Sequence, residues 1–289
     1  MGILTGLLLL GLSMIGDEDA AHKMLLEKGA KVVLSKRGVI SLVEAGDVSK
    51  WTDDEIKLLG GLGDLENLSV GPGFSDEHLK LMAGLLRLET LQTNESRITD
   101  DGVKGLLPLK KLRTLKFFHP GKTFTGSGLA ALAELPNLQS LTVAGSLAFG
   151  DEGMAAVATL QGLYEFRTWH AGVTIEGTRK LKALPKLRSL TLGQRLAYQP
   201  PTSVSDETVA VLVELKALDT LRLEEARMSL AALSRLQGLP GLKTLVLEGI
   251  ELPEADVDKL RQQLPAAKVQ WTKPSEAYQK RIQALFGNN

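Results

Sequence analysis

The sequence contains no cysteine, which excludes disulfide bonds and metal sites built on thiolates. Aromatic residues make up only 4% of the chain, and leucine dominates its apolar fraction. Neither sign of charge is in excess, because 34 Lys and Arg residues balance 34 Asp and Glu residues. A protein that binds nucleic acid usually carries a stripe of basic residues, and none is found here. We therefore expect no nucleic-acid partner and no general attraction to an anionic membrane.

Common catalytic motifs are also missing. The sequence has no H-E-x-x-H, no G-x-S-x-G and no phosphate-binding loop, and we interpret residues 60–63, GGLG, as a helix end. Acid pairs such as Asp53-Asp54 are explained as helix starts, where carboxylates interact favourably with the helix dipole. Of the four histidines, only His119 and His170 are related by position, and we expect them to lie too far apart to share a metal ion. The sequence thus predicts a protein that is not an enzyme and has no metal site and no cofactor.

An apolar run near the N-terminus, ILTGLLLLGLSMI at residues 3–15, is shorter than the roughly 20 residues of a membrane-spanning helix. It is similar to the core of a secretory signal. No Lys or Arg precedes it, however, and the possible cleavage site Gly11-Leu12-Ser13 lies inside it. We expect residues 1–16 to be a signal peptide of a secreted, periplasmic or cell-envelope protein without a stable membrane span. A cytoplasmic protein with an apolar first helix is the alternative.

The strongest pattern is a pair of residues that recurs eight times: a residue typical of a helix N-terminus and, thirteen residues later, a leucine that opens a strand. Ser or Thr, which cap helix N-termini by accepting a backbone N–H bond, stands thirteen residues before seven of eight strand-opening leucines, and glycine stands before the eighth. Apolar residues follow each start at intervals of three, as on one buried helix face, with Thr178 as the exception. The eight pairs are Thr52 and Leu65, Ser75 and Leu88, Thr99 and Leu112, Thr125 and Leu138, Gly150 and Leu163, Thr174 and Leu187, Ser205 and Leu218, and Ser229 and Leu242.

Each unit therefore predicts one short helix followed by one short strand. The distance from a strand-opening leucine to the next helix start varies between 10 and 18 residues, so insertions fall on one edge of the molecule. The longest connection, residues 193–204, contains Pro200-Pro201, and we expect Arg195 and Tyr198 to reach towards a site on that edge.

The pattern Leu-x-x-Leu-x-Leu/Val, with a helix in each unit of about 24 residues, resembles the leucine-rich-repeat family. The Thr/Ser-Asp helix starts are similar to those of bacterial leucine-rich-repeat proteins and of ribonuclease-inhibitor-like and F-box-associated repeats. The resemblance covers residues 39 to 272. The Asn or Cys usual at the ninth repeat position is absent, and residues such as Gly73, Ser96 and Ile250 stand there.

The resemblance implies an α/β fold, a right-handed leucine-rich-repeat solenoid or horseshoe with a parallel concave β-sheet and convex helices. It also implies ligand binding on the concave sheet without catalytic residues. We expect an N-terminal cap over residues 17–51, with a helix at residues 20–28 and a strand at residues 39–43. The solenoid follows over residues 52–272. A C-terminal capping helix is expected over residues 273–289, with an apolar side of Tyr278, Ile282, Leu285 and Phe286; an interaction helix is the alternative.

A candidate binding surface follows from the alternation of side chains along each strand. The last outward position of the strands carries Phe118 and Trp169 two repeats apart, about 10 Å from one another, with Ala144 between them. Cations and histidines accompany these aromatic residues. The candidate ligand-binding residues on the concave face are Lys116, Phe118, His119, Arg167, Trp169, His170 and Arg222. Packing of the two aromatic rings against the variable loops is the alternative interpretation.

The sequence predicts a non-enzymatic scaffold that binds a protein or peptide on the concave face, as a monomer. One alternative is an intracellular substrate-recognition adaptor of the F-box or ubiquitin-ligase type, although the 50 residues before the repeats offer little room for a recruiting domain. Another alternative is an envelope protein that binds a glycan. Loss of binding on Trp169→Ala, with Lys116→Ala harmless, would favour a stacked glycan over a charged ligand.

Overall fold

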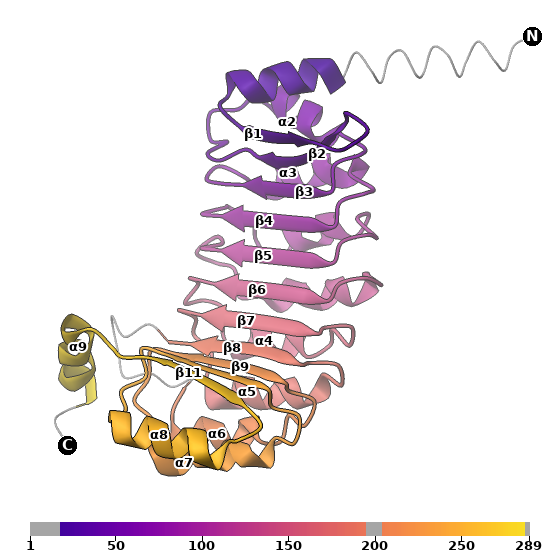
Figure 1. Cartoon of the computed structure of the whole chain (residues 1–289). Coiled ribbons are helices and arrows are strands. Elements are labelled where there is room, and N and C mark those ends of the chain that lie inside the picture. Colours follow the sequence, from indigo (N-terminus) through magenta and orange to yellow (C-terminus); the bar gives the residue numbers. More distant parts are fainter. Residues whose placement is uncertain (1–17, 195–203, 287–289) are drawn as a thin grey trace, which may run out of the picture. The chain divides into compact units, whose positions relative to one another are not determined.

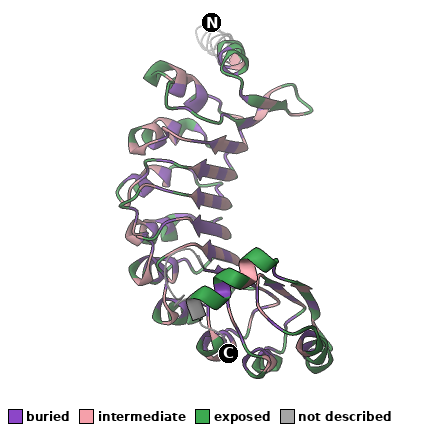
Figure 2. Ribbon diagram, turned by 90° about the vertical axis from the view of Figure 1, so that its left-hand side faces the viewer, coloured by how far each residue is buried: buried purple, intermediate pink, exposed green. Residues whose placement is uncertain are grey.

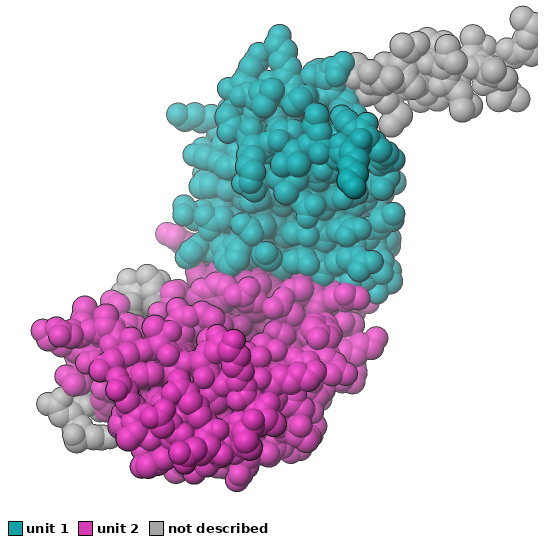
Figure 3. Space-filling view, in the orientation of Figure 1, with its two compact units in different colours: residues 1–121, 134–138 teal, residues 122–133, 139–289 magenta. Residues whose placement is uncertain are grey.

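The computed structural model describes residues 18–194 and 204–286. It contains two compact units, drawn in different colours in Figure 3: unit 1 comprises residues 1–121 and 134–138, and unit 2 comprises residues 122–133 and 139–289. The signal peptide predicted at residues 1–16, and the predicted roles of Arg195 and Tyr198, lie outside the described residues. Within residues 18–194 and 204–286, no helix combines the length and the hydropathy of a bilayer span.

Unit 1 begins with the predicted cap. A helix spans residues 18–27, and the strands β1 (Lys31–Leu34) and β2 (Ile40–Glu44) form an antiparallel hairpin. The sequence predicted the helix and β2 but missed β1. The reason is that β1 has no buried face: Val33 and Leu34 are 42% and 47% exposed, so its side chains show no alternation of apolar and polar residues.

The repeats of unit 1 follow this hairpin. Parallel strands β3 (Asn67–Val70), β4 (Thr90–Asn94) and β5 (Thr114–Phe118) extend the sheet from β2 in sequence order. Helical segments line one face of these strands, as Figure 2 shows. They are α2 (Asp53–Gly60), α3 (Asp76–Leu81) and the 3₁₀ helices η1 (Met82–Gly84) and η2 (Gly102–Leu106).

Unit 2 repeats the same plan (Figure 1). Its strands lie side by side, parallel and in sequence order: β6 (Ser140–Ala144), β7 (Glu165–Trp169), β8 (Ser189–Gly193), β9 (Thr220–Glu224), β10 (Thr244–Glu248) and β11 (Lys268–Thr272). The helices are η3 (Ser127–Glu134, whose last residue belongs to unit 1), α4 (Asp151–Val157), α5 (Ile175–Lys180), η4 (Leu181–Ala183), α6 (Asp206–Leu212), α7 (Leu230–Ser234), η5 (Arg235–Gly238), α8 (Glu254–Gln263) and α9 (Glu276–Phe286).

The predicted leucines form the core of both units. Each strand from β3 to β10 begins two residues after a predicted strand-opening leucine, and all eight of these leucines are at most 4% exposed. Thr178, the polar exception, is fully buried, and its hydroxyl donates to the Thr174 carbonyl oxygen at 3.2 Å. The predicted α/β leucine-rich-repeat solenoid, with one parallel strand and one helical segment in each repeat, is confirmed.

The helix starts do more than cap their own helices. Thr52, Ser75, Gly150, Thr174, Ser205 and Ser229 are N-cap residues as predicted. The aspartate after a cap also reaches the next repeat: Asp76 accepts from the amide and the hydroxyl of Thr99 at 2.9 and 2.7 Å. Asp151 binds Thr174 in the same way, and Asp206 accepts from the Ser229 amide. These aspartates are structural, as predicted, but they link successive repeats in addition to any effect on the helix dipole.

Two repeats replace the predicted α-helix with 3₁₀ turns. η2 begins three residues after Thr99, whose hydroxyl is used by Asp76. In the next repeat, Thr125 accepts from the amide of Ser127 at 3.2 Å, at the start of η3. The spacing of buried leucines is compatible with both helix types over so few residues, so the sequence pattern did not distinguish them.

Candidate binding surface

The side chains that point away from the helices form the outer sheet face of each unit. In β4, β5, β7, β9 and β10 buried residues alternate with more exposed ones, which is the pattern expected of a sheet with one face on the core. In unit 1 this face includes a hollow of about 350 Å³. Its lining is mostly uncharged and consists of Leu42, Val43, Glu44, Asn67, Leu68, Ser69, Thr90 and Gln92.

Three predicted site residues lie in unit 1, on or next to β5. Lys116 and Phe118 are partly exposed on the outer sheet face, as predicted from the alternation. His119 is exposed directly after the strand, and its Nδ1 lies 3.2 Å from Oδ1 of Asn94, the last residue of β4. The structure therefore places a cation, an aromatic ring and an imidazole at the C-terminal end of one strand.

Four predicted site residues lie in unit 2, and two of them are in direct contact. The guanidinium carbon of Arg167 lies 5.4 Å from the ring centroid of Trp169, which is within the range of a cation–π interaction. Both residues stand on β7 and are partly exposed. The contact places a guanidinium against the indole ring two residues away on the same strand.

Gly193 brings Trp169 close to a carboxylate. Gly193 ends β8, between Trp169 of β7 and Glu224 of β9. A Cβ at this position would lie 2.8 Å from Trp169 Cβ and 3.0 Å from Glu224 Oε2, which is too close for any larger residue. The absence of a side chain at Gly193 therefore leaves room for Trp169 of β7 and Glu224 of β9, which lie against it from either side.

Arg222 is held between two carboxylates. Its guanidinium forms hydrogen-bonded ion pairs with Glu224 on the same strand and with Glu248 on β10. The predicted role of Arg222 as a cation for the ligand was thus incomplete, because the sequence reading did not include its two partners. Glu224 and Glu248 end β9 and β10, which is the strand position that Trp169 has on β7.

The two histidines occupy a special backbone position. Each residue that follows β4, β5, β7 and β9 has a positive φ: Glu95 at 51°, His119 at 46°, His170 at 52° and Glu225 at 58°. Glycines stand at the same place after β6 and β10, with φ of 77° at Gly145 and 64° at Gly249. This conformation is costly for residues with a side chain, although His tolerates it better than most. The positive φ ends each strand in a turn. Glutamate, histidine and glycine all adopt this conformation here, so the turn alone does not explain the choice of histidine.

His170 uses its position to reach another repeat. Its Nε2 lies 3.7 Å from Oε1 of Glu225, which follows β9. The pair spans the end of β8, where the buried Gln194 stands at this level directly after Gly193. In unit 2 the predicted residues Arg167, Trp169 and His170 are therefore joined by Glu224 and Glu225, which the sequence reading missed as site residues.

Gln194 is a further residue that sequence reasoning missed. It is 2% exposed, and its Nε2 donates to the carbonyl oxygens of Val204 at 2.6 Å and of Glu225 at 3.4 Å. Gln194 therefore holds the base of the long connection against the turn after β9. A glutamine at a turn position gives no signal in a single sequence.

The groove predicted between Phe118 and Trp169 stays a prediction, because Phe118 belongs to unit 1 and Trp169 to unit 2. The described residues 18–194 and 204–286 contain no group of three or more His, Asp or Glu side chains that could hold a metal ion.

Comparisons with known proteins identify similar folds. No protein-family model and no curated protein sequence matches the chain. One similar solved structure is internalin C2 from Listeria monocytogenes, with a TM-score of 0.47 and 19% identity over 75% of this chain and 84% of that one. Another is TLR13 in complex with ssRNA13, with a TM-score of 0.48 and 20% identity over 73% of this chain. This chain spans 29% of that TLR13 chain.

Proposed function

We propose that this leucine-rich-repeat chain is a non-enzymatic scaffold that binds a protein or peptide on the outer face of its sheet. The observation that carries the proposal is the arrangement around Trp169, whose indole ring contacts Arg167 on the same strand and whose Cβ lies, like Glu224 of β9, against Gly193 of β8. Trp and Arg are the residues that dominate protein–protein hot spots, and such residues act best when their orientation is fixed in advance.

The chemistry of this surface suits a polypeptide better than a small charged ligand. Arg222 and its partners Glu224 and Glu248 neutralise one another in part, so the surface offers both hydrogen-bond donors and acceptors without a strong field of one sign. A polypeptide presents the same mixture, together with apolar side chains for the indole ring. We include Arg167, His170 and Arg222 in the proposed contact in unit 2, and Lys116, Phe118 and His119 in unit 1.

The test is a pull-down from the native host with the wild type and the variant Trp169→Ala, with circular dichroism showing that both fold. The matched control is Tyr164→Ala, which removes another aromatic side chain, 47% exposed, that stands just before β7. We expect a partner that wild type and Tyr164→Ala retain and Trp169→Ala loses. Equal capture of the same partners by all three proteins would refute a binding site at Trp169.

We also propose that the protein is secreted, periplasmic or held in the cell envelope, and the support is the apolar run at residues 3–15. Fractionation of the native host, with the mass of the purified mature protein, tests this proposal. A cytoplasmic protein that retains residues 1–16 would contradict it and favour the intracellular alternative.

A further inference from the structure

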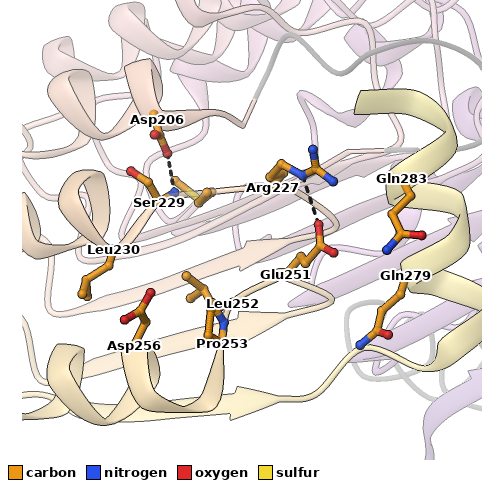
Figure 4. Close-up of a pocket in the computed structure, with 11 residues that line it drawn as sticks. Asp206, Arg227, Ser229, Leu230, Glu251, Leu252, Pro253, Asp256, Gln279 and Gln283 are labelled. Carbon is orange, nitrogen blue, oxygen red and sulfur yellow. Dashed lines mark hydrogen bonds and ion pairs between the residues drawn. The ribbon is translucent and has the colours of Figure 1, made fainter. Parts of the chain in front are cut away.

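A second cavity lies in unit 2, away from the outer sheet face. It encloses about 880 Å³ and is open to solvent. None of the residues that line it belongs to a strand from β6 to β11. As Figure 4 shows, the turns after β9 and β10 form its centre, the starts of α6, α7 and α8 lie on one side, and α9 forms the opposite wall.

The centre of the cavity is partly apolar. Met228 and Leu252 are buried there, next to Pro253 at the start of α8. Arg227 and Glu251 cross the cavity as an ion pair with Nε and Oε2 3.0 Å apart. Because Arg227 is paired with Glu251, the other charged side chains among the described lining residues are Asp206 and Asp256.

Asp206 differs from the other aspartates that link repeats. Asp151 uses both carboxylate oxygens, one for the amide and one for the hydroxyl of Thr174. Asp206 uses one oxygen for the amide of Ser229, whose hydroxyl accepts from the amide of Ala232 instead. The second oxygen of Asp206 therefore makes no hydrogen bond to another described residue, and its carboxylate lines the cavity.

The wall formed by α9 is anchored by two side chains. Ile282 is fully buried, and the ring of Tyr278 packs on Gly249, where a Cβ would lie 3.0 Å from the ring. Burial raises the pKa of the Tyr278 hydroxyl far above its usual range, and the nearby Glu225 and Glu224 raise it further, so this phenol stays neutral. Gln279 and Gln283 of the same helix line the cavity and face Arg227 and Glu251 (Figure 4).

We infer that this cavity binds an extended segment of a basic polypeptide. A Lys or Arg side chain of the ligand pairs with Asp206 and Asp256, and an apolar neighbour of that side chain packs on Met228 and Leu252. The carboxamides of Gln279 and Gln283 offer donors and acceptors, which is the combination that a peptide group requires. Nε2 of Gln279 donates one of its two hydrogens to the Pro274 carbonyl oxygen at 3.3 Å and keeps the other for a ligand. Charge complementarity favours this ligand, because among the described lining residues three carboxylates, Asp206, Glu251 and Asp256, stand against one cation, Arg227. Lys259, which is outside this lining, pairs with Asp256 at 2.9 Å.

The probe is a fluorescein-labelled peptide, Ala-Leu-Arg-Leu-Ala, with Ala-Leu-Glu-Leu-Ala as its acidic counterpart. Fluorescence anisotropy with the full chain measures the two dissociation constants at low ionic strength. The test variant is Asp206→Asn/Asp256→Asn, because asparagine keeps an acceptor for the Ser229 amide while removing the charge. The matched control is Glu207→Gln/Asp258→Asn, which removes two exposed carboxylates from the same helices outside the cavity.

We expect the arginine peptide to bind the wild type and the control alike, and the test variant about tenfold more weakly. A second variant, Gln279→Ala/Gln283→Ala, should also weaken binding severalfold, because it removes the carboxamides of the α9 wall. Equal weakening by the control variant would show a general effect of charge and overturn the inference. Equal binding of the acidic peptide, or no binding of the arginine peptide to the wild type at millimolar concentration, would overturn it as well.

Discussion

Asp151 accepts two hydrogen bonds from Thr174 of the following repeat, one from the amide at 2.8 Å and one from the hydroxyl at 2.6 Å. The same hydroxyl accepts from the amide of Glu176 and thereby caps α5. Thr174 therefore caps its own helix and also binds Asp151 at the start of the preceding helix, α4. In unit 1, Asp76 accepts the same two hydrogen bonds from Thr99. The register of neighbouring repeats is fixed by this link as well as by the leucine core.

Asp151→Ala removes both bonds to Thr174. We expect the free energy of unfolding to fall by about 2 kcal/mol, since a buried hydrogen-bond donor that loses its partner costs about 1–3 kcal/mol. Asp151→Asn keeps one acceptor and should cost less. Urea unfolding followed by circular dichroism measures the change. Glu152→Ala, at an exposed neighbouring position, is the control and should change the free energy by about 0.5 kcal/mol or less. A loss as large in the control would contradict the link.

Gly177→Ala tests the same contact from the other side. A Cβ at Gly177 would lie 2.3 Å from Oδ1 of Asp151 and 3.0 Å from Cγ of Met154. Helix propensity alone predicts that alanine stabilises α5 by about 1 kcal/mol. We expect the clash to outweigh this gain and to destabilise the protein by about 1–3 kcal/mol. In Gly63→Ala nothing lies within 4 Å of the new Cβ, so its stability should hardly change. A stabilised Gly177→Ala variant would show that Asp151 moves aside easily.

Much of the fold could be predicted because a buried face repeats along the sequence. Leu163 and Leu187 each stand two residues before the strand that they predicted, β7 and β8. Both leucines are buried in the core, and this burial is what the repeated spacing reflects. β1 could not be predicted, because Val33 and Leu34 are held by backbone pairing with β2 and not by burial. The periodicity reports burial, and strands that are not buried leave no periodic signal.

The candidate site was predicted in its positions but not in its pairings. Phe118 and Trp169 were predicted at the last outward position of their strands, and both residues end strands in the structure. The ion pairs of Arg222 depend on which rotamer a long side chain adopts among several neighbours, and residue spacing does not determine this. The alignment of neighbouring strands does indicate the candidates, since Glu224 stands two residues after Arg222 and Glu248 of β10 is paired with Glu224.

Glu95→Gly tests the strained turn after β4. Glu95 has a φ of 51° and is exposed, and the left-handed conformation costs a residue with a side chain about 1–2 kcal/mol. Glycine relieves this cost but loses about 0.5–1 kcal/mol in the entropy of the unfolded chain. We therefore expect Glu95→Gly to be equal to or slightly more stable than the wild type, as measured by urea unfolding. Glu95→Val, with a branched Cβ, should be the least stable of the three. The reverse order would show that the Glu95 side chain stabilises the turn.

Arg222→Met leaves Glu224 and Glu248 opposite each other on paired strands without a cation between them. Like charges in this arrangement destabilise a sheet, and we expect a loss of about 1 kcal/mol at low salt. In 1 M NaCl the loss should shrink, because salt screens the repulsion at this partly exposed site. Arg188→Met is the control, since Arg188 is more exposed and lies 3.9 Å from Asp219. A loss for Arg222→Met that does not depend on salt would indicate packing, not charge, as the role of this side chain.

His78 should make the stability of unit 1 depend on pH. Burial lowers the pKa of its imidazole below the usual value, and this outweighs the opposing influence of Asp53 and Glu77. Its ring packs against Phe74 with the centroids 5.6 Å apart, and Nδ1 is buried without a hydrogen-bond partner among the described residues. The folded state therefore favours the neutral form, whereas the unfolded state takes up a proton below its ordinary pKa of about 6.5. The free energy of unfolding should fall as the pH is lowered from 7 to 5 and be unaffected by this residue above pH 7. Urea unfolding of the wild type and His78→Leu across this range measures the effect; parallel curves for the two proteins would exclude His78 as its source.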